Sequence, residues 1–198
     1  MAQLILDRLT SAFTGGEIEQ IGSQHGNEWA RVRRDAWTLV CRFLKDDPAT
    51  QMNMASDLTC VDRLQRQPRF DVVLHLYSVE KKHRVRLYAG VPEEDCGLDS
   101  VTPIWPGMDW FEREAYDLYG VRFRGHPDLR RILMYPEFEG HPLQRTYPAQ
   151  KTQPLVPYRT EEEAGVPLFK QAPFGDDEGM PFGRNPAHPH PGLDGLED

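Results

Sequence analysis

The chain has 198 residues, of which 27% are charged, and its formal net charge is −8 at pH 7. This length fits one domain with extensions and a sizeable core. No run of residues approaches the ~18 apolar residues of a membrane span, and the acidic balance gives no basic footprint for nucleic acid. The three cysteines (Cys41, Cys60 and Cys96) are too widely spaced for a disulfide framework, which favours a reducing compartment.

The first third of the chain predicts two helices and a hairpin. Apolar residues at helical spacing predict a short helix over residues 2–14. Weakly alternating segments at 17–21 and 28–33, separated by a glycine-containing turn, predict a β-hairpin. Asp35 is placed to cap a second helix that continues to Lys45. The apolar faces of these two helices comprise Leu6, Leu9, Phe13, Trp37, Val40, Cys41 and Leu44.

The middle of the chain predicts most of a sheet. Residues 52–62 are ambiguous but contain a strand, whereas residues 70–79 and 83–91 alternate clearly between apolar and polar and form the clearest strands. The resulting order is α-β-β-α-β-β-β. We therefore predict an α+β fold, a two-layer domain with helices on one face of a mixed sheet.

A further helix is predicted over residues 100–119. Ser100 is placed to cap it and Gly120 lies where a helix-ending glycine belongs. From a start near Asp109, one face of this helix should enter the core. That face comprises Phe111, Ala115 and Leu118.

The composition changes after about Thr146. Eight of the 17 prolines follow residue 153, and residues 161–198 hold nine acidic but only two basic side chains. Such closely spaced prolines prevent regular structure, yet large apolar residues recur among them. We predict a domain over residues 1–148, with its motif region at 101–148. An extended, acidic, Pro-rich C-terminal arm over 149–198 is expected to lie on neighbouring subunits, and plain disorder is the alternative.

Signatures of common catalytic sites are absent from the sequence. It contains no glycine-rich dinucleotide or phosphate loop, no C-x-x-C pair and no nucleophile or zinc-protease motif. We therefore predict no catalytic, cofactor-binding or metal-binding residue in this chain.

Charges of both signs crowd residues 110–134. The carboxylates of Glu114 and Asp117 are i, i+3 neighbours and could act as acid and base, or hold a metal with His126 or His141. Ordinary surface ion pairs are a second interpretation, but each contributes only ~0–1 kcal/mol. We favour an interface, where fixed charges set specificity and register. Its predicted residues are Glu112, Arg113, Glu114, Asp117, His126, Asp128, Arg130, Arg131 and His141.

The same region carries a long ordered motif. It consists of Glu112-Arg113-Glu114, Asp117-Leu118, Gly120-Val121, Phe123, Gly125-His126-Pro127-Asp128-Leu129-Arg130-Arg131-Ile132-Leu133, Gly140-His141-Pro142-Leu143 and Tyr147-Pro148. With these residues the chain resembles the 30 kDa subunit family of respiratory complex I, whose bacterial members are known as the C subunit. One departure is Leu143-Gln144-Arg145-Thr146-Tyr147-Pro148, where that family usually has Leu-Arg-Lys-Asp-Tyr-Pro. It predicts the loss of one basic and one acidic contact.

The resemblance implies a non-catalytic subunit of NADH–quinone oxidoreductase, a complex that couples NADH oxidation and quinone reduction to proton translocation. FMN, the iron–sulfur clusters and quinone would all be bound by partner subunits. The implied partners are the quinone-cavity subunit and the terminal iron–sulfur cluster subunit of the hydrophilic arm, so the chain would be part of a hetero-oligomer. It would be peripheral, on the cytoplasmic side of the bacterial inner membrane.

Three alternatives stay open at this point. The chain could serve a related membrane complex fed by ferredoxin, hydrogenase or a deazaflavin. It could be a small metal-dependent enzyme that uses Glu114, Asp117 and His126. It could also be a free adaptor protein.

Overall fold

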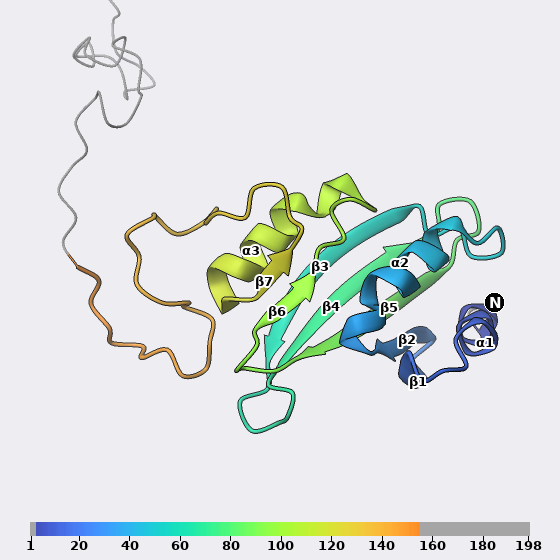
Figure 1. Ribbon diagram of the computed structural model, residues 1–198, viewed down its shortest axis with the longest axis horizontal. Helices are drawn as coiled ribbons and strands as arrows, with labels where there is room; N and C mark the ends of the chain where they lie inside the picture. The colour runs from blue at the N-terminus through green and yellow to red at the C-terminus, as the bar shows by residue number, and fades with distance from the viewer. Residues whose placement is uncertain (1–2, 155–198) are drawn as a thin grey trace, which may run out of the picture. The chain divides into compact units, whose positions relative to one another are not determined.

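The computed structural model describes residues 3–154 (Figure 1). Most of the predicted arm, residues 155–198, lies outside the described residues. The elements, in chain order, are α1 (Gln3–Ala12), β1 (Ile18–Gln24), β2 (Asn27–Val32), a 3₁₀ turn (Arg34–Ala36), α2 (Trp37–Asp46), β3 (Met54–Asp62), β4 (Phe70–Tyr77), β5 (Arg84–Val91), β6 (Gly97–Asp99), a 3₁₀ turn (Pro106–Met108), α3 (Asp109–Tyr119) and β7 (Arg122–Arg124).

The five long strands form one mixed sheet in the order β1-β2-β5-β4-β3. Strands β2 and β5 run parallel, whereas the other neighbours are antiparallel. The predicted α+β fold with a mixed sheet is therefore confirmed. The short strands β6 and β7 form a separate parallel pair that the sequence did not predict, because three residues are too few for an alternating pattern to be recognised.

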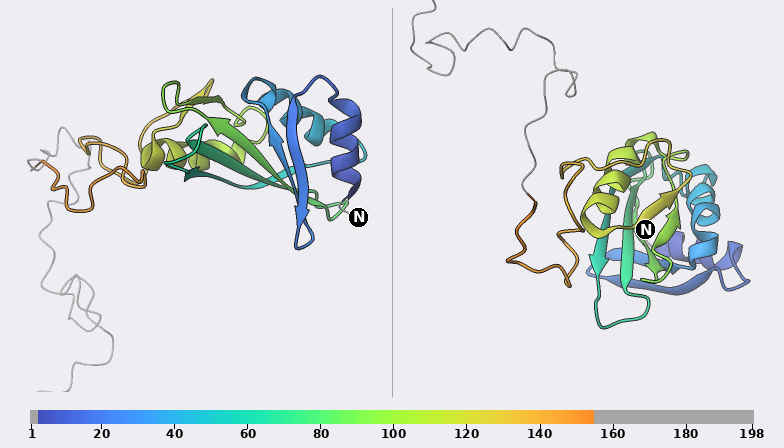
Figure 2. Two further views of the ribbon diagram at one scale, coloured as in Figure 1. Left: turned by 90° about the horizontal axis from the view of Figure 1, so that it is seen from below. Right: turned by 60° about the vertical axis from the view of Figure 1, so that its left-hand side comes forward.

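One hydrophobic core lies between the sheet and the helices. It includes Leu9 of α1, Trp37 of α2, Leu74 of β4, Leu87 of β5 and Ala115 of α3. Figure 1 shows α2 and the β6–β7 pair in front of the large sheet, with α3 alongside β3. Figure 2 shows α1 beside the β1–β2 hairpin, at the opposite end of the sheet from α3. The helices thus cover one face of the sheet, as predicted.

Two predicted helix starts are wrong. Asp35 does not cap α2, because its carboxylate pairs with the Arg33 guanidinium at 2.6 Å and the residue lies within the preceding 3₁₀ turn. The helix predicted from Ser100 begins only at Asp109. Proline at positions 103 and 106 disfavours regular α-helix before that point, and Pro106 opens a 3₁₀ turn instead.

The predicted apolar face of α3 is only partly correct. Ala115 is buried, but Phe111 and Leu118 are half-buried. The core beside α3 also contains Val101, Ile104, Trp105 and Met108 from the segment before the helix, together with Val121 and Phe123 after it. The ends of α3 therefore pack under loops, and its middle carries the polar residues considered next.

Candidate inter-subunit surface

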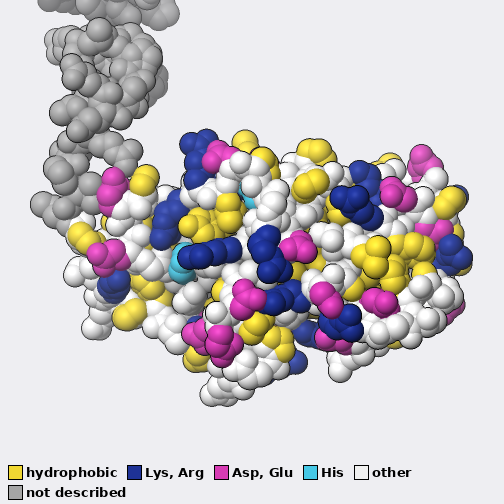
Figure 3. All heavy atoms as spheres, in the orientation of Figure 1, with side chains coloured by type: hydrophobic (Ala, Val, Ile, Leu, Met, Phe, Trp, Pro, Cys, Tyr) yellow, Lys and Arg dark blue, Asp and Glu magenta, His cyan; other side chains and the backbone are white. Residues whose placement is uncertain are grey.

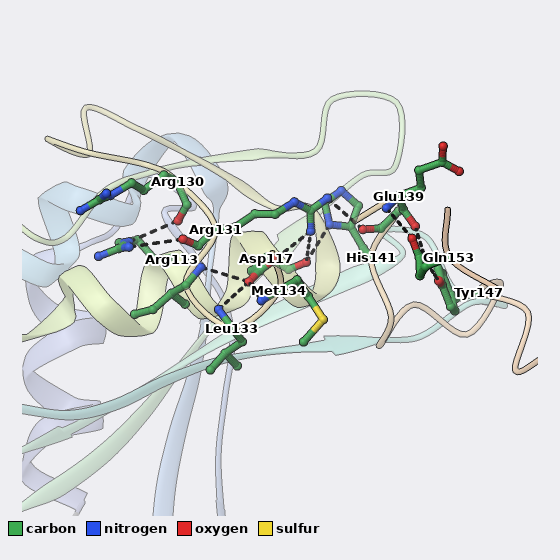
Figure 4. Close-up of polar contacts among 12 residues, drawn as sticks. Arg113, Asp117, Arg130, Arg131, Leu133, Met134, Glu139, His141, Tyr147 and Gln153 are labelled. Atoms are coloured by element: carbon green, nitrogen blue, oxygen red, sulfur yellow. Dashed lines mark hydrogen bonds and ion pairs between the residues drawn. The ribbon is translucent and has the colours of Figure 1, made fainter. Parts of the chain in front are cut away.

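Asp117 lies in α3 and is completely buried. Its carboxylate accepts hydrogen bonds from the Arg131 guanidinium at 2.7 Å and from the backbone N–H groups of Ile132, Leu133 and Met134 at 3.1, 2.8 and 2.8 Å (Figure 4). Burial alone would raise the pKa of this carboxyl, but the hydrogen bonds from Met134 and Arg131 lower it below its ordinary value. Asp117 therefore stays ionised and holds the chain after α3 in one conformation.

Two further motif residues fasten the same segment to α3. The Arg113 guanidinium donates to the carbonyl oxygens of Arg130 and Arg131, at 3.2 and 3.3 Å. His141 Nδ1–H donates to the Asp117 carbonyl oxygen at 2.9 Å. The His141 ring lies so close to Gly120 that a Cβ at Gly120 would come within 2.8 Å of it, and Gly120 also has a φ of +84°. Glycine is therefore required where α3 ends, as its sequence position predicts.

Glu112 is also completely buried, and its partners lie before the helix. The carboxylate accepts hydrogen bonds from the Ser100 hydroxyl at 2.6 Å, the Val101 N–H at 2.7 Å and the Thr102 hydroxyl at 3.2 Å. Burial raises the pKa of Glu112 above its ordinary value, although the bonds from Ser100 and Val101 oppose the shift. Ser100 thus anchors the turn to α3 instead of capping a helix.

We expect Glu112→Gln to cost no more than about 1 kcal/mol at pH 7, since the hydroxyls of Ser100 and Thr102 can reverse and accept from the amide. A carboxyl whose pKa is raised by folding loses stability as the pH rises above its ordinary value of 4.5. The glutamine has no proton to lose, so the free energy of unfolding of the variant should rise relative to that of the parent between pH 5 and pH 7. Urea unfolding at both pH values tests this, and a deficit that grows with pH contradicts it.

His126 has a local structural role. The Asp128 N–H donates to His126 Nδ1 at 3.0 Å, so the proton of the neutral ring lies on Nε2. That Nε2–H lies 3.2 Å from the Asp109 carbonyl oxygen, to which it donates. The two histidines of the motif thus hold separate turns against α3, one at each end of the helix.

The three residues of the metal-enzyme alternative are not brought together. Glu114 is exposed, Asp117 is saturated by Arg131 and backbone amides, and His126 contacts Asp109. Within residues 3–154, no group of three or more histidine, cysteine, aspartate or glutamate side chains is placed to hold a metal ion. The interpretation of Glu114 and Asp117 as paired catalytic carboxylates is likewise unsupported, because only one of them reaches solvent.

Another buried carboxylate fastens the end of the motif to the sheet. Asp62 of β3 accepts hydrogen bonds from Arg69 Nε and Nη2 at 3.0 and 2.8 Å, and from the Arg145 N–H at 2.8 Å. Arg69 Nη2 also donates to the Thr146 hydroxyl at 3.1 Å, and Gln144 Nε2 donates to the Tyr119 carbonyl at 2.7 Å. Gln144 and Thr146, which stand where the family usually has an arginine and an aspartate, therefore make polar contacts in uncharged form.

Several side chains on and beside α3 take no part in these internal contacts. Arg130 and Asp128 form an exposed ion pair at 2.8 Å, with 71% and 60% of their side chains accessible. Trp110 is 70% exposed, and Leu133 and Leu143 are 57% and 50% exposed. We call the set of Trp110, Glu114, Asp128, Arg130, Leu133 and Leu143 the α3 surface. Figure 3 shows acidic, basic and hydrophobic side chains interleaved on one face of the molecule, with no continuous area of one charge.

The structure shows which residues of the predicted interface are accessible, but it does not test whether they contact a partner. Glu114, Asp128 and Arg130 are accessible, whereas Glu112 and Asp117 are enclosed by the chain itself. Three exposed apolar residues were missed, because apolar side chains inside a motif are normally taken as core and nothing in their spacing marks them otherwise. Contact with a partner stays a prediction for every residue of the set.

Comparison with known proteins identifies relatives of the chain. Residues 30–153 match the family model described as "Respiratory-chain NADH dehydrogenase, 30 Kd subunit". The C subunit of NADH-quinone oxidoreductase from Geobacter sulfurreducens is 50% identical over 126 residues, which cover 63% of this chain and 76% of that protein. The same subunit from Caulobacter vibrioides is 54% identical over 106 residues, which cover 54% of this chain and 53% of that protein.

Two solved structures share the fold. The trypsin-resistant fragment of Nqo5 is 32% identical, with a TM-score of 0.56 over 63% of this chain and 99% of the fragment. A chain of an archaeal membrane-bound sulfane sulfur reductase aligns with a TM-score of 0.62 over 75% of this chain and 86% of that chain. Its identity is only 20%, so it supports the fold alone.

Proposed function

The chain belongs to the family of the 30 kDa subunit of respiratory-chain NADH dehydrogenase, and from this premise we propose that it is a non-catalytic structural subunit of the hydrophilic arm of NADH–quinone oxidoreductase. In this role it assembles and stabilises the quinone-reducing module. Its neighbours are the quinone-cavity subunit and the terminal iron–sulfur cluster subunit. The complex couples NADH oxidation and quinone reduction to proton translocation, and the chain lies on the cytoplasmic side of the inner membrane.

The observation that carries the proposal is the internal use of the motif's polar groups. The polar groups of Glu112, Asp117 and His126 all have intramolecular hydrogen-bond partners, which supports a structural use of these residues. Exposed Trp110 and Leu133 offer apolar contacts beside them instead. Aromatic, arginine and apolar side chains around a rigid segment are typical of a protein interface. In the described part of the chain, no helix is long and apolar enough to cross a membrane.

Purification of the tagged chain from gently solubilised membranes of its host tests the proposal. We expect a large assembly that contains flavin and iron–sulfur clusters and reduces quinone with NADH. The same clusters without NADH activity would assign the chain to a complex fed by ferredoxin, hydrogenase or a deazaflavin. Recovery of the chain alone would contradict the proposal and favour the adaptor.

Substitutions of the adjacent residues Arg130 and Arg131 should distinguish an effect on assembly from an effect on folding. Arg130 is exposed and, within residues 3–154, forms an ion pair with Asp128 alone, so Arg130→Glu should change the free energy of unfolding by less than about 1 kcal/mol. If the α3 surface contacts a partner, the same change should reduce the assembled complex several-fold. Arg131→Glu places a second carboxylate beside buried Asp117 and should destabilise the chain by about 3–5 kcal/mol.

Native gel electrophoresis of membranes, together with thermal unfolding of the purified chain, distinguishes these effects. Normal assembly of the Arg130→Glu variant would show that Arg130 does not contribute to the interface. A loss of stability in Arg130→Glu as large as that in Arg131→Glu would show that the two arginines have the same role.

A further inference from the structure

A groove of about 570 Å³ crosses four strands of the large sheet, near the start of β2 and β5. Its side chains lie on the face opposite the helices, because Leu76 and Val85 belong to the core and their strand neighbours point the other way. It is therefore distinct from the α3 surface. The one carboxylate among the lining residues, Glu28, is an exception, because it is buried, alternates along β2 with the core residues Ala30 and Val32, and so lies on the other face from the two arginines. The groove is lined by Asn27, Glu28, Met54, Ser56, His75, Leu76, Tyr77, Arg84, Val85 and Arg86.

The groove gathers positive charge that the described residues do not neutralise. Arg84 lies with its guanidinium 5.2 Å from the centre of the Tyr77 ring, and Arg86 lies 6.0 Å from that of Tyr88. Neither arginine has a hydrogen bond or ion pair to a carboxylate within residues 3–154, unlike Arg31 nearby, which pairs with Asp71 at 2.8 Å. These two cations lie beside tyrosine rings and have no anionic partner among the described residues.

The neighbours of the two arginines on β4 do not supply the missing negative charge. His75 lies directly opposite Arg86 across the β4–β5 ladder, and Tyr77 lies opposite Arg84. Burial lowers the pKa of His75, the charge of Asp57 on β3 opposes the shift, and the charge of Arg86 adds to it. The imidazole is therefore neutral at pH 7 and adds no charge of either sign. An anion bound in the groove would give Arg84 and Arg86 the partner that they lack among the described residues.

We propose that this groove binds an acidic segment of a neighbouring subunit of the complex. A guanidinium group beside an aromatic ring still presents a planar donor pair that fits a carboxylate. Arginine, tyrosine and methionine are also residues that protein interfaces favour, and Met54 is 47% exposed at the groove. The inference rests on the proposed function, since the partner is another subunit of the same assembly. It gives the chain two contact faces on opposite sides of its sheet.

Site-specific crosslinking in the assembled complex tests the groove. The full chain is expressed in its host with a photo-crosslinking amino acid in place of Met54, and the crosslinked peptide is identified by mass spectrometry. We expect one peptide of a different subunit, with several acidic residues. The yield should fall about tenfold or more in Arg84→Glu/Arg86→Glu, and less in Arg84→Lys/Arg86→Lys. Arg42→Glu, at an exposed position on α2, is the matched control and should leave the yield unchanged.

Each other outcome has a definite meaning. If the complex assembles but no crosslink forms, the proposed role of the groove is wrong. The same holds if the crosslink yield does not depend on Arg84 and Arg86. In both cases the proposed function of the chain stands. A crosslink to residues 161–198 of the chain itself, or to a second copy, also overturns it. A chain recovered without other subunits overturns both proposals. If the glutamate variant fails to fold, Arg84→Gln/Arg86→Gln removes the charges without reversing them and takes its place.

Discussion

Replacing Asp117 by asparagine is expected to lower the free energy of unfolding by about 3–5 kcal/mol, because it removes one partner of a buried ion pair. The three N–H groups point at Oδ2 and the Arg131 guanidinium points at Oδ1, so the NH₂ group of the asparagine would have to face one set of donors or the other. Arg131 would also lose the only carboxylate within its reach among the described residues. Few single changes in this chain should cost more.

The effect should be concentrated in the segment after α3. Arg113 and His141 would still hold its two ends, so we expect local opening around residues 131–134 before the sheet unfolds. Hydrogen exchange of the amides of Ile132, Leu133 and Met134 in the full chain measures this directly. Glu114→Gln, at an exposed position of the same helix, is the matched control and should change stability by less than about 0.5 kcal/mol. Equal effects of the two substitutions would refute the structural role of Asp117.

Asp62→Asn should also be costly and lower the free energy of unfolding by about 3 kcal/mol or more near neutral pH. The bidentate Arg69 guanidinium lowers the pKa of Asp62 from its ordinary value of 3.8 to about 2, although burial opposes the shift. A carboxyl with a lowered pKa contributes stability that is fully present above 3.8 and is lost as the pH falls through 2. The difference in the free energy of unfolding between the parent chain and the variant should therefore become smaller as the pH falls from 4 to 2.

Chemical denaturation at several pH values measures that difference. The exposed pair of Asp99 and Arg124, at 2.9 Å, provides the control, because Asp99→Asn should cost less than about 1 kcal/mol. If the difference in the free energy of unfolding between the parent and Asp62→Asn stays constant from pH 7 to pH 2, Asp62 does not contribute stability through its buried charge. The prediction also concerns function, because Asp62 holds the Arg145 amide and so fixes the end of the motif segment.

Sequence periodicity predicted most of the fold, and its errors fall at particular elements. Alternation located β4 and β5, and helical spacing located α1 and α2. The start of α3 was placed too early because the pattern contains apolar residues that are buried in a turn, as Val101 and Trp105 are. Periodicity reports which residues face the core, and it does not distinguish a helix from a packed turn when prolines intervene.

The candidate site shows a different limit. The motif located the important charges, but the sequence could not show which would be enclosed. Asp117 meets Arg131 and the following amides 14–17 residues away, and Asp62 meets the Arg145 amide 83 residues away. No local pattern encodes such long-range pairs. Charges expected to face a partner therefore proved, for Glu112 and Asp117, to hold the chain's own loops.

Removal of this chain from its host is the measurement that tests the account most directly. NADH–quinone activity and the size of the assembled complex would be measured in membranes without the chain, and again after its gene is restored. We predict that the assembly and its quinone-reducing activity are lost together and that both return with the parent chain. A complex of otherwise full composition, with undiminished activity in the absence of the chain, would contradict the central claim.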